Sequence, residues 1–223
     1  MDWDAFKLSL QLALYTVLLL LPLAILTARW MVTLTARRKA VIEAMLTIPL
    51  ILPPTVMGFF LLVTMSESQL PGRIWRALFD QTLVFSFEGL LLASIIVNIP
   101  FAVQPALRAL ESIGNDLREA AETCGMSRWH AFKRIELPLA WPGILTGAVL
   151  TFAHTLGEFG VVLMVGGNIP GETRTISIAI YDQVQSFDNR SAAIMAAILL
   201  AISVLAISIT FLLTRKPYVR IRA

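Results

Sequence analysis

Between two long apolar segments the chain reads Glu119-Ala120-Ala121, then Gly125, and then Ile135-x-Leu137-Pro138. These residues lie in a short, charged stretch, residues 114–136, which we call the polar connection. Glutamate and alanine favour a helix, whereas glycine suits the left-handed position just past a helix end. The pattern therefore predicts two short helices, set at an angle to each other, with the glycine between them.

The boundaries of these short helices follow from their capping residues. Asn115 or Asp116 is the expected N-cap of the first helix, because a short polar side chain there accepts from free backbone N–H groups. Ser127 is expected to cap the second helix, residues 128–135, and Leu137-Pro138 to end it. An ordinary solvated loop with some helical content is the alternative interpretation.

The apolar segments on either side indicate a chain that crosses a membrane. Of the 223 residues, 57% are hydrophobic and only 15% are charged, and the mean hydropathy is +0.75. A helix needs roughly 20 apolar residues to cross the hydrocarbon core, and backbone groups in lipid must pair within their own segment. We therefore predict an all-α, polytopic protein, one transmembrane domain over residues 1–223. The predicted spans are residues 8–32, 41–65, 87–109, 137–166 and 191–214.

The basic residues are distributed unevenly between the two sides of these five transmembrane helices. Alternate connections and the tail hold 13 of the 18 lysines and arginines, which are Arg29, Arg37, Arg38, Lys39, Arg108, Arg118, Arg128, Lys133, Arg134, Arg215, Lys216, Arg220 and Arg222. The other side holds Lys7, Arg73, Arg76, Arg174 and Arg190. The positive-inside rule then predicts the N-terminus outside, the C-terminus in the cytoplasm, and the polar connection on the cytoplasmic side between helices three and four.

The sequence carries no recognisable catalytic or nucleotide-binding motif. It has no G-x-x-x-x-G-K-[ST], H-E-x-x-H, C-x-x-C or G-x-S-x-G pattern, and it has only two histidines. The net charge of +3 does not indicate a nucleic-acid partner. We therefore expect no enzyme activity, no metal site and no cofactor, with the lipid bilayer as the surroundings.

Three prolines interrupt the second predicted span, at Pro49, Pro53 and Pro54. Broken backbone at membrane depth must be buried in protein or face water, which favours a bent helix that lines a path. A structural kink packed against neighbouring helices is the alternative. Asn98 in the third span has two equal interpretations, a group in the path and an interhelical hydrogen bond.

The fourth span contains an acid within Gly157-Glu158-Phe159-Gly160. A charge in an apolar span is expensive and indicates function by default. A bare carboxylate would repel an anionic cargo, so we predict that Glu158 shapes a gate or bonds nearby backbone amides and does not bind substrate. His154 lies one turn earlier and is expected to pair with it.

The spacing of the polar connection, E-A-A, three residues, G, nine residues and I-x-L-P, resembles the signature loop of ATP-binding-cassette importer permeases at all seven fixed positions. The resemblance implies that an ATPase subunit, present in two copies, docks on the polar connection and drives alternating access. It also implies a second permease copy in a homodimer. The implied docking residues are Glu119, Ala120, Ala121, Gly125, Ile135, Leu137 and Pro138.

A narrower resemblance lies in Gly157-Glu158-Phe159-Gly160 and in residues 167–176, Gly-Asn-Ile-Pro-Gly-Glu-Thr-Arg-Thr-Ile. Together with Leu52-Pro53-Pro54 these look like the permease subunit of molybdate importers of bacterial or archaeal cytoplasmic membranes. The resemblance implies import of an oxyanion, with molybdate favoured and sulfate, thiosulfate or tungstate as alternatives. Residues 49, 53, 54, 98 and 157–160 are then the expected path and gate.

The spans hold no cluster of lysine or arginine that would bind a dianion, so selectivity should come from an external binding protein. We expect that protein on the outer connections, residues 66–88 and 169–190, with Glu172 and Arg174 as contacts. A solvated Arg174 is an equal alternative. A proton-coupled carrier using His154 and Glu158, or a membrane scaffold without transport, are the competing functions.

Overall fold

The computed structural model describes residues 2–214, and within this part of the chain all regular secondary structure is helical. The four long helices are α1 (Trp3–Val32), α5 (Phe87–Glu111), α8 (Leu137–Gly157) and α11 (Asn189–Thr214). The shorter ones are α2 (Ala36–Ile51), α3 (Pro54–Met65), α4 (Leu70–Phe79), α6 (Asn115–Thr123), α7 (Arg128–Ala131), the π-helical turn η1 (Phe132–Glu136), α9 (Gly160–Gly166) and α10 (Ile176–Gln185). The all-α prediction is confirmed. The basic tail residues Arg215, Lys216, Arg220 and Arg222 lie outside the described residues.

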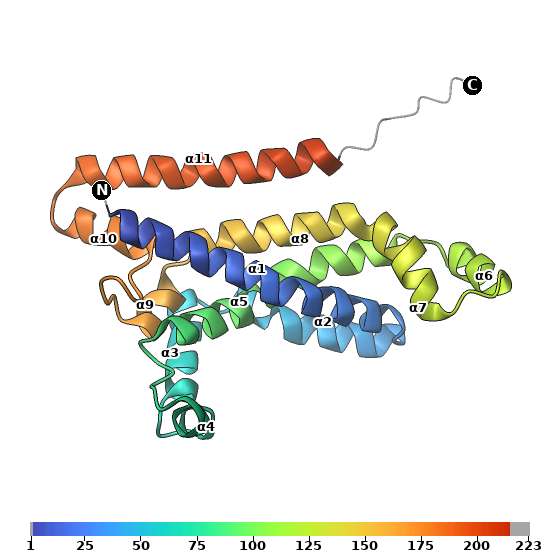
Figure 1. Ribbon diagram of the computed structural model, residues 1–223, viewed down its shortest axis with the longest axis horizontal. Coiled ribbons are helices and arrows are strands. Elements are labelled where there is room, and N and C mark those ends of the chain that lie inside the picture. The colour runs from blue at the N-terminus through green and yellow to red at the C-terminus, as the bar shows by residue number, and fades with distance from the viewer. Residues whose placement is uncertain (1, 215–223) are drawn as a thin grey trace.

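The centre of the molecule is a bundle of α1, α5 and α8, with α2 along α5 and α11 along α8 (Figure 1). Small residues bring these helices close together. Ala24 and Ala28 of α1 share one buried cluster with Ala102 and Ala106 of α5. On α8, a Cβ added to Gly147 would lie 2.9 Å from the Ala102 carbonyl oxygen. Close approach through small residues is the usual way that helices associate in lipid.

Among residues 2–214, four helices are long and apolar enough to span a membrane, and the count becomes five if the bent pair α2 and α3 forms one span. Helix α2 ends at Ile51, and α3 starts again at Pro54 after an extended Leu52 and Pro53. The two helices are bent by 104° at this point. Proline has no backbone N–H and clashes with the preceding turn, so the predicted break is present where the prolines stand.

A second break divides the segment that we expected to be one span over residues 137–166. Helix α8 ends at Gly157, Glu158 is extended, and α9 begins at Gly160. Glycines on both sides of Glu158 weaken the helix, and the Glu158 side chain can then bond the free N–H groups of the next helix.

The polar connection folds into α6 and a second helix that differs from the prediction. Gly125 has φ +78°, and the Met126 and Gly125 N–H groups donate to the Ala121 and Glu122 carbonyls, which is a Schellman ending. Ser127 caps α7, as predicted, by accepting from the His130 N–H. The second helix does not end at Leu137-Pro138, however. It passes through η1 into α8, because the π turn pairs the Leu137 N–H with Phe132 O and accommodates a following proline without an N–H.

The predicted N-cap of α6 is also wrong. Gly114 occupies that position, and Asn115 is the first helical residue, with Asp116 in the first turn. The Asn115 side chain accepts a hydrogen bond from Arg118 at 3.1 Å and is therefore not used as a cap.

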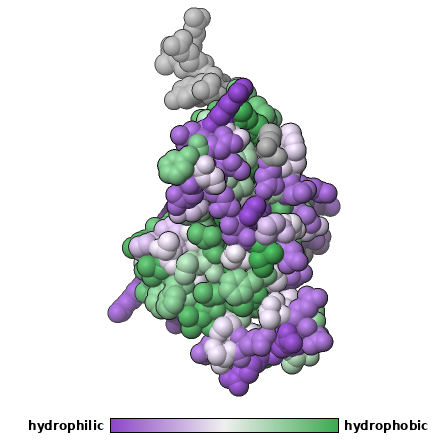
Figure 2. All heavy atoms as spheres, turned by 90° about the vertical axis from the view of Figure 1, so that its left-hand side faces the viewer, coloured by the Kyte–Doolittle hydropathy of each residue, from purple (hydrophilic) through white to green (hydrophobic). Residues whose placement is uncertain are grey.

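Apolar side chains cover much of the molecular exterior. On α11, Leu200, Leu205 and Leu212 are between 61% and 70% exposed, as expected for a surface that meets lipid tails. Figure 2 shows the end of the molecule on which α4 and α10 lie, where hydrophobic and hydrophilic residues share the exposed surface.

Candidate functional site

The polar connection lies beyond the ends of the long helices, where α6 and α7 form one tip of the molecule (Figure 1). Glu119, Ala120 and Gly125 are exposed on this tip, whereas Ala121 is buried. Exposed Leu117 and Trp129 add apolar surface beside them. An exposed patch of small and apolar residues on short helices can receive the surface of another protein.

The second half of the motif has a different environment. Ile135 and Leu137 are half-buried, and Pro138 is exposed at the start of α8. Glu136, the variable position between them, is only 8% exposed. Sequence reasoning did not single out Glu136, because nothing local distinguishes it from other acids of the polar connection. It forms ion pairs with Arg118 of α6 and with Arg29 of the distant α1, each at 3.6 Å.

At the other end of the bundle, the two helix breaks meet. A Cβ added to Gly160 would lie 2.8 Å from Cβ of Pro54, and one added to Gly58 would lie 2.8 Å from Cβ of Met164. A cavity of ≈ 270 Å³ lies beside this contact, lined by Pro49, Leu50, Leu52, Pro54, Met57, Val97, Phe101, His154, Glu158 and Val161. The structure thus brings both breaks to one cavity.

Only some of the predicted gate residues lie at this cavity. Pro49, Pro54 and Glu158 line the cavity, and Gly160 holds the contact next to it. Pro53 and Gly157 are exposed. Phe159 instead packs against Tyr181, with ring centroids 5.0 Å apart.

Asn98 lies buried behind the cavity and fixes His154. Its Nδ2 donates to the Ser94 carbonyl at 2.8 Å and to Thr155 Oγ1 at 3.1 Å. Its Oδ1 is left as the acceptor that faces His154 Nδ1 at 3.1 Å. Nδ1 of the imidazole therefore donates to this oxygen, and the ring stacks on Phe101 with ring centroids 4.2 Å apart. Of the two interpretations considered from the sequence, these contacts correspond to the interhelical hydrogen bond, because they join Asn98 of α5 to α8.

Glu158 uses its carboxylate to start α9. Oε1 accepts from the Val161 N–H at 3.0 Å, while Oε2 lies 3.6 Å from His154 Nε2. Its carbonyl oxygen accepts from Ser177 Oγ at 2.6 Å. These contacts are those expected of a carboxylate that bonds freed backbone amides, and they hold the break between α8 and α9 in one shape.

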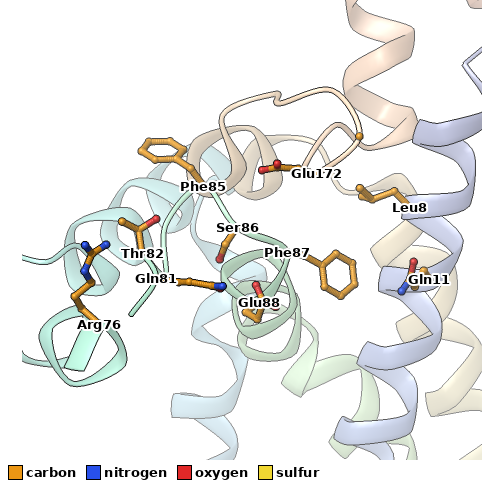
Figure 3. Close-up of a pocket in the computed structure, with 11 residues that line it drawn as sticks. Leu8, Gln11, Arg76, Gln81, Thr82, Phe85, Ser86, Phe87, Glu88 and Glu172 are labelled. Atoms are coloured by element: carbon orange, nitrogen blue, oxygen red, sulfur yellow. The ribbon is translucent and has the colours of Figure 1, made fainter. Parts of the chain in front are cut away.

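An open hollow of ≈ 590 Å³ lies on the opposite side of the molecule from α6. It is lined by Leu8, Gln11, Arg76, Gln81, Thr82, Phe85, Ser86, Phe87, Glu88, Gly171 and Glu172. Figure 3 shows the charged groups Arg76, Glu88 and Glu172 around this hollow, contributed by three separate parts of the chain. Its mixed charges and open shape are suited to a protein surface.

Arg174 does not line the hollow. Its Nε donates to Asn168 Oδ1 at 2.8 Å, and its guanidinium lies 3.5 Å from Asp182 and 3.8 Å from Asp2. The side chain is therefore engaged in an ion-pair cluster that ties the loop after α9 to α10 and to the start of α1. The isolated, solvated arginine considered from the sequence does not describe this arrangement.

Residues 20–216 match the family model described as binding-protein-dependent transport system inner membrane component. The chain is 45% identical over 191 residues to the molybdenum transport system permease protein ModB of Azotobacter vinelandii, covering 86% of this chain and 84% of that protein. It is 40% identical over 215 residues to ModB of Escherichia coli (strain K12), covering 96% and 94%. The sulfate transport system permease protein CysT of the same strain is 35% identical over 167 residues, covering 75% and 60%.

Two solved structures have a similar fold. One is a bacterial ABC transporter involved in the import of the acidic polysaccharide alginate, with a TM-score of 0.72 and 20% identity over 95% of this chain and 79% of that chain. The other is a bacterial alginate ABC transporter in complex with an alginate pentasaccharide-bound periplasmic protein, with a TM-score of 0.73 and 21% identity over 96% and 79%. The likeness extends to nearly the whole helical arrangement described above.

Proposed function

Because this chain belongs to the family of binding-protein-dependent transport system inner membrane components, we propose that it is the membrane-spanning permease of a molybdate importer. The assignment of molybdate as the substrate rests on the 40% identity to a molybdenum transport permease over 96% of this chain and 94% of that relative. The sulfate permease CysT is the runner-up, since it is aligned over only 60% of its length. Tungstate, an oxyanion of the same shape and charge, is a further candidate cargo.

The chain does not hydrolyse ATP in this proposal, and a separate ATPase subunit supplies the energy. The exposed tip of α6, with Glu119, Ala120 and Gly125, supports a docking role toward such a subunit. Ala121 is buried beneath these exposed residues and packs α6 against the rest of the protein. Two ATPase copies would serve a homodimer of this chain, because closed twofold symmetry is the commonest arrangement of identical subunits.

In the proposed topology, α2 and α3 together form one broken span, which gives five spans with the N-terminus outside and the C-terminus in the cytoplasm. The arginines and lysines near α6 and α7 support this orientation through the positive-inside rule. The tip of α6 then faces the cytoplasmic ATPase. The hollow that holds Glu88 and Glu172 faces outward, where an external binding protein delivers the oxyanion.

The cavity between the two helix breaks is the proposed gate. Broken backbone at membrane depth is tolerated where it lines a cavity, and Pro54 and Gly160 place two such segments in contact. Movement of α3 and α9 together, relative to α5 and α8, would open or close the cavity that His154 and Glu158 line. Glu158 is retained as a shaping group, because its carboxylate is already bonded to the Val161 N–H.

The test is ATP hydrolysis by the complex of permease and ATPase in proteoliposomes, with binding protein loaded with molybdate, tungstate or sulfate. We expect molybdate-loaded binding protein to stimulate hydrolysis and to give uptake into the lumen. If only the sulfate-loaded binding protein stimulated hydrolysis, the cargo would be sulfate and not molybdate. Uptake by the permease without any ATPase, driven by a pH gradient, would instead support the proton-coupled carrier.

A further inference from the structure

Helix α6 is attached to the rest of the chain through a glycine at each end. Gly114 precedes it and Gly125 follows it, and a Cβ added at either position would meet no atom within 4 Å. Glycine is the most permissive residue for the backbone, so these two positions are weak points for passing a movement along the chain. Side chains that reach from α6 to the long helices can bypass them.

Arg118 of α6 is such a side chain. Its Nη2 donates to the Leu110 carbonyl at the end of α5 at 2.8 Å, and its Nε lies 3.6 Å from Glu136 Oε1 at the end of η1. One arginine thus connects α6 to α5 and, through η1, to α8, without using either glycine.

Glu136 extends the connection to α1. Its other oxygen, Oε2, lies 3.6 Å from Arg29 Nη1, so one buried carboxylate is shared between two arginines of different helices. Arg29 is held against the second helix of the polar connection as well. Its Nη2 donates to the Arg128 carbonyl at 2.9 Å, and its guanidinium lies 4.1 Å from the Phe132 ring centroid.

The π turn of η1 helps to create this arrangement. Phe132 and Glu136, its first and last residues, are both buried, whereas Lys133 and Arg134 between them are exposed. Single π turns inside α-helices are frequent at functional sites. Here the turn places both the Phe132 ring, against which Arg29 packs, and the Glu136 carboxylate, which pairs with Arg29 and Arg118.

The shared carboxylate is not locked in place. Both arginines lie at ion-pair distance, beyond a normal hydrogen bond, and Arg29 Nη1 is buried without a hydrogen-bond partner. A cavity of ≈ 270 Å³ borders the group, with Arg29, Arg118, Arg128, Glu122 and Glu136 in its wall. Glu136 can therefore shorten one contact and lengthen the other when α6 shifts.

We propose that Glu136, shared between Arg118 of α6 and Arg29 of α1, is the positioning residue that passes movement of α6 to the long helices. The inference rests on the proposed function, in which an ATPase moves α6. It assigns the transmission to three charged side chains and not to the glycine-flanked backbone. A contiguous chain of ion-paired side chains between two elements is the kind of network that can carry coupling between sites.

The experiment compares Arg118→Gln, Glu136→Gln and the double variant in the full complex with the ATPase, reconstituted in proteoliposomes. Three quantities are measured: the amount of ATPase that co-purifies, the unstimulated ATP hydrolysis, and the stimulation by molybdate-loaded binding protein. We expect the first two to stay within about twofold, and the stimulation to fall by about fivefold or more, the lower end of typical coupling between sites. The losses in the double variant should be less than the two single losses combined, because both substitutions remove the same Arg118–Glu136 contact.

Glu122→Gln is the matched control. Glu122 is an exposed acid of α6 that pairs with Arg128 at 3.3 Å, and its substitution removes the same charge as Glu136→Gln without removing the Arg118–Glu136 or Arg29–Glu136 ion pair. We expect its stimulation to match that of the unaltered protein. An equal loss in Glu122→Gln, or a loss of ATPase binding in step with stimulation, would overturn the proposal in favour of a charge or assembly effect.

Full stimulation in both Arg118→Gln and Glu136→Gln would also overturn it. Glu136→Gln could fail to fold, because Arg29 would lose its buried charged partner. In that case the result with Arg118→Gln is sufficient to test the proposal, since the Arg29–Glu136 ion pair is intact in that variant. Failure of the proposed function gives a different result, because the unaltered chain itself would then bind no ATPase.

Discussion

Gly160 at the start of α9 lies directly against Pro54 at the start of α3, so that an added Cβ would come within 2.8 Å of Pro54 Cβ and 3.1 Å of the Thr55 nitrogen. The two segments are remote in the sequence, and each begins just after a break in a helix. Their contact is backbone against proline ring, which leaves little room for adjustment. This contact joins the two breaks into one unit beside the cavity that holds His154 and Glu158.

The first prediction concerns this contact. Gly160→Ala should destabilise the protein by about 1–3 kcal/mol, because overpacking forces the backbone of α3 and α9 apart, and it should lower uptake. Gly157→Ala, on the other side of Glu158, is the matched control, since a Cβ there meets nothing within 4 Å. Thermal unfolding in detergent and uptake in proteoliposomes measure both effects. Equal behaviour of the two variants would contradict the close contact.

The second prediction concerns the end of α6. Gly125→Ala should cost about 1–2 kcal/mol locally, because φ is +78° at that position and an L residue is strained there. We expect weaker ATPase association, measured by co-purification. Gly114→Ala, whose φ of −57° suits any residue, should have no such effect. A normal yield of complex with Gly125→Ala and Gly125→Asp would count against the docking role.

The third prediction separates the structural and the proton-carrying interpretations of Glu158. Glu158→Gln keeps an oxygen that can accept from the Val161 N–H, so stability and ATP-driven uptake should be retained. Glu158→Ala leaves that buried donor unpaired and should cost about 1–3 kcal/mol, measured by thermal unfolding. Loss of uptake in the glutamine variant with unchanged stability would instead mean that the charge takes part in transport.

The fourth prediction concerns the outer loop. Arg174→Glu places a third acid beside Asp2 and Asp182 and should lower stability by roughly 0.5–3 kcal/mol. Glu172→Gln alters an exposed side chain on the wall of the outer hollow. It should leave stability unchanged and shift the concentration of binding protein needed for half-maximal ATP hydrolysis. If Arg174→Glu changes that concentration and not the stability, Arg174 is a binding-protein contact.

The sequence was sufficient for the helical fold and for its main interruption. The lengths of the apolar runs predicted the long helices, and the run Pro49, Pro53, Pro54 predicted the break between α2 and α3, because these effects are local. The 104° bend was not predictable, since it depends on how α3 packs against α9. The break after Gly157 was missed, because it depends on Glu158 finding the Val161 N–H and Ser177.

The same division holds for the candidate site. The motif residues of the polar connection could be selected by spacing, and Gly125 by its backbone preference. Glu136 and Arg29 could not, because their ion pairs depend on how α1 and α6 pack against η1 in three dimensions. The spacing also suggested that Leu137-Pro138 ends the second short helix, whereas a π turn carries the helix through the proline. Predicting such a turn requires knowing what the side chains on either side of it contact.

The central claim is that this chain is a passive path moved by an ATPase that binds at α6. The most direct measurement is molybdate accumulation in proteoliposomes, with the permease alone and with ATPase, ATP and binding protein. The account predicts accumulation only in the complete system, and its loss when the docking residues on α6 are altered. Accumulation against a gradient by the permease alone, or full activity of a complex in which α6 cannot be cross-linked to the ATPase, would contradict it.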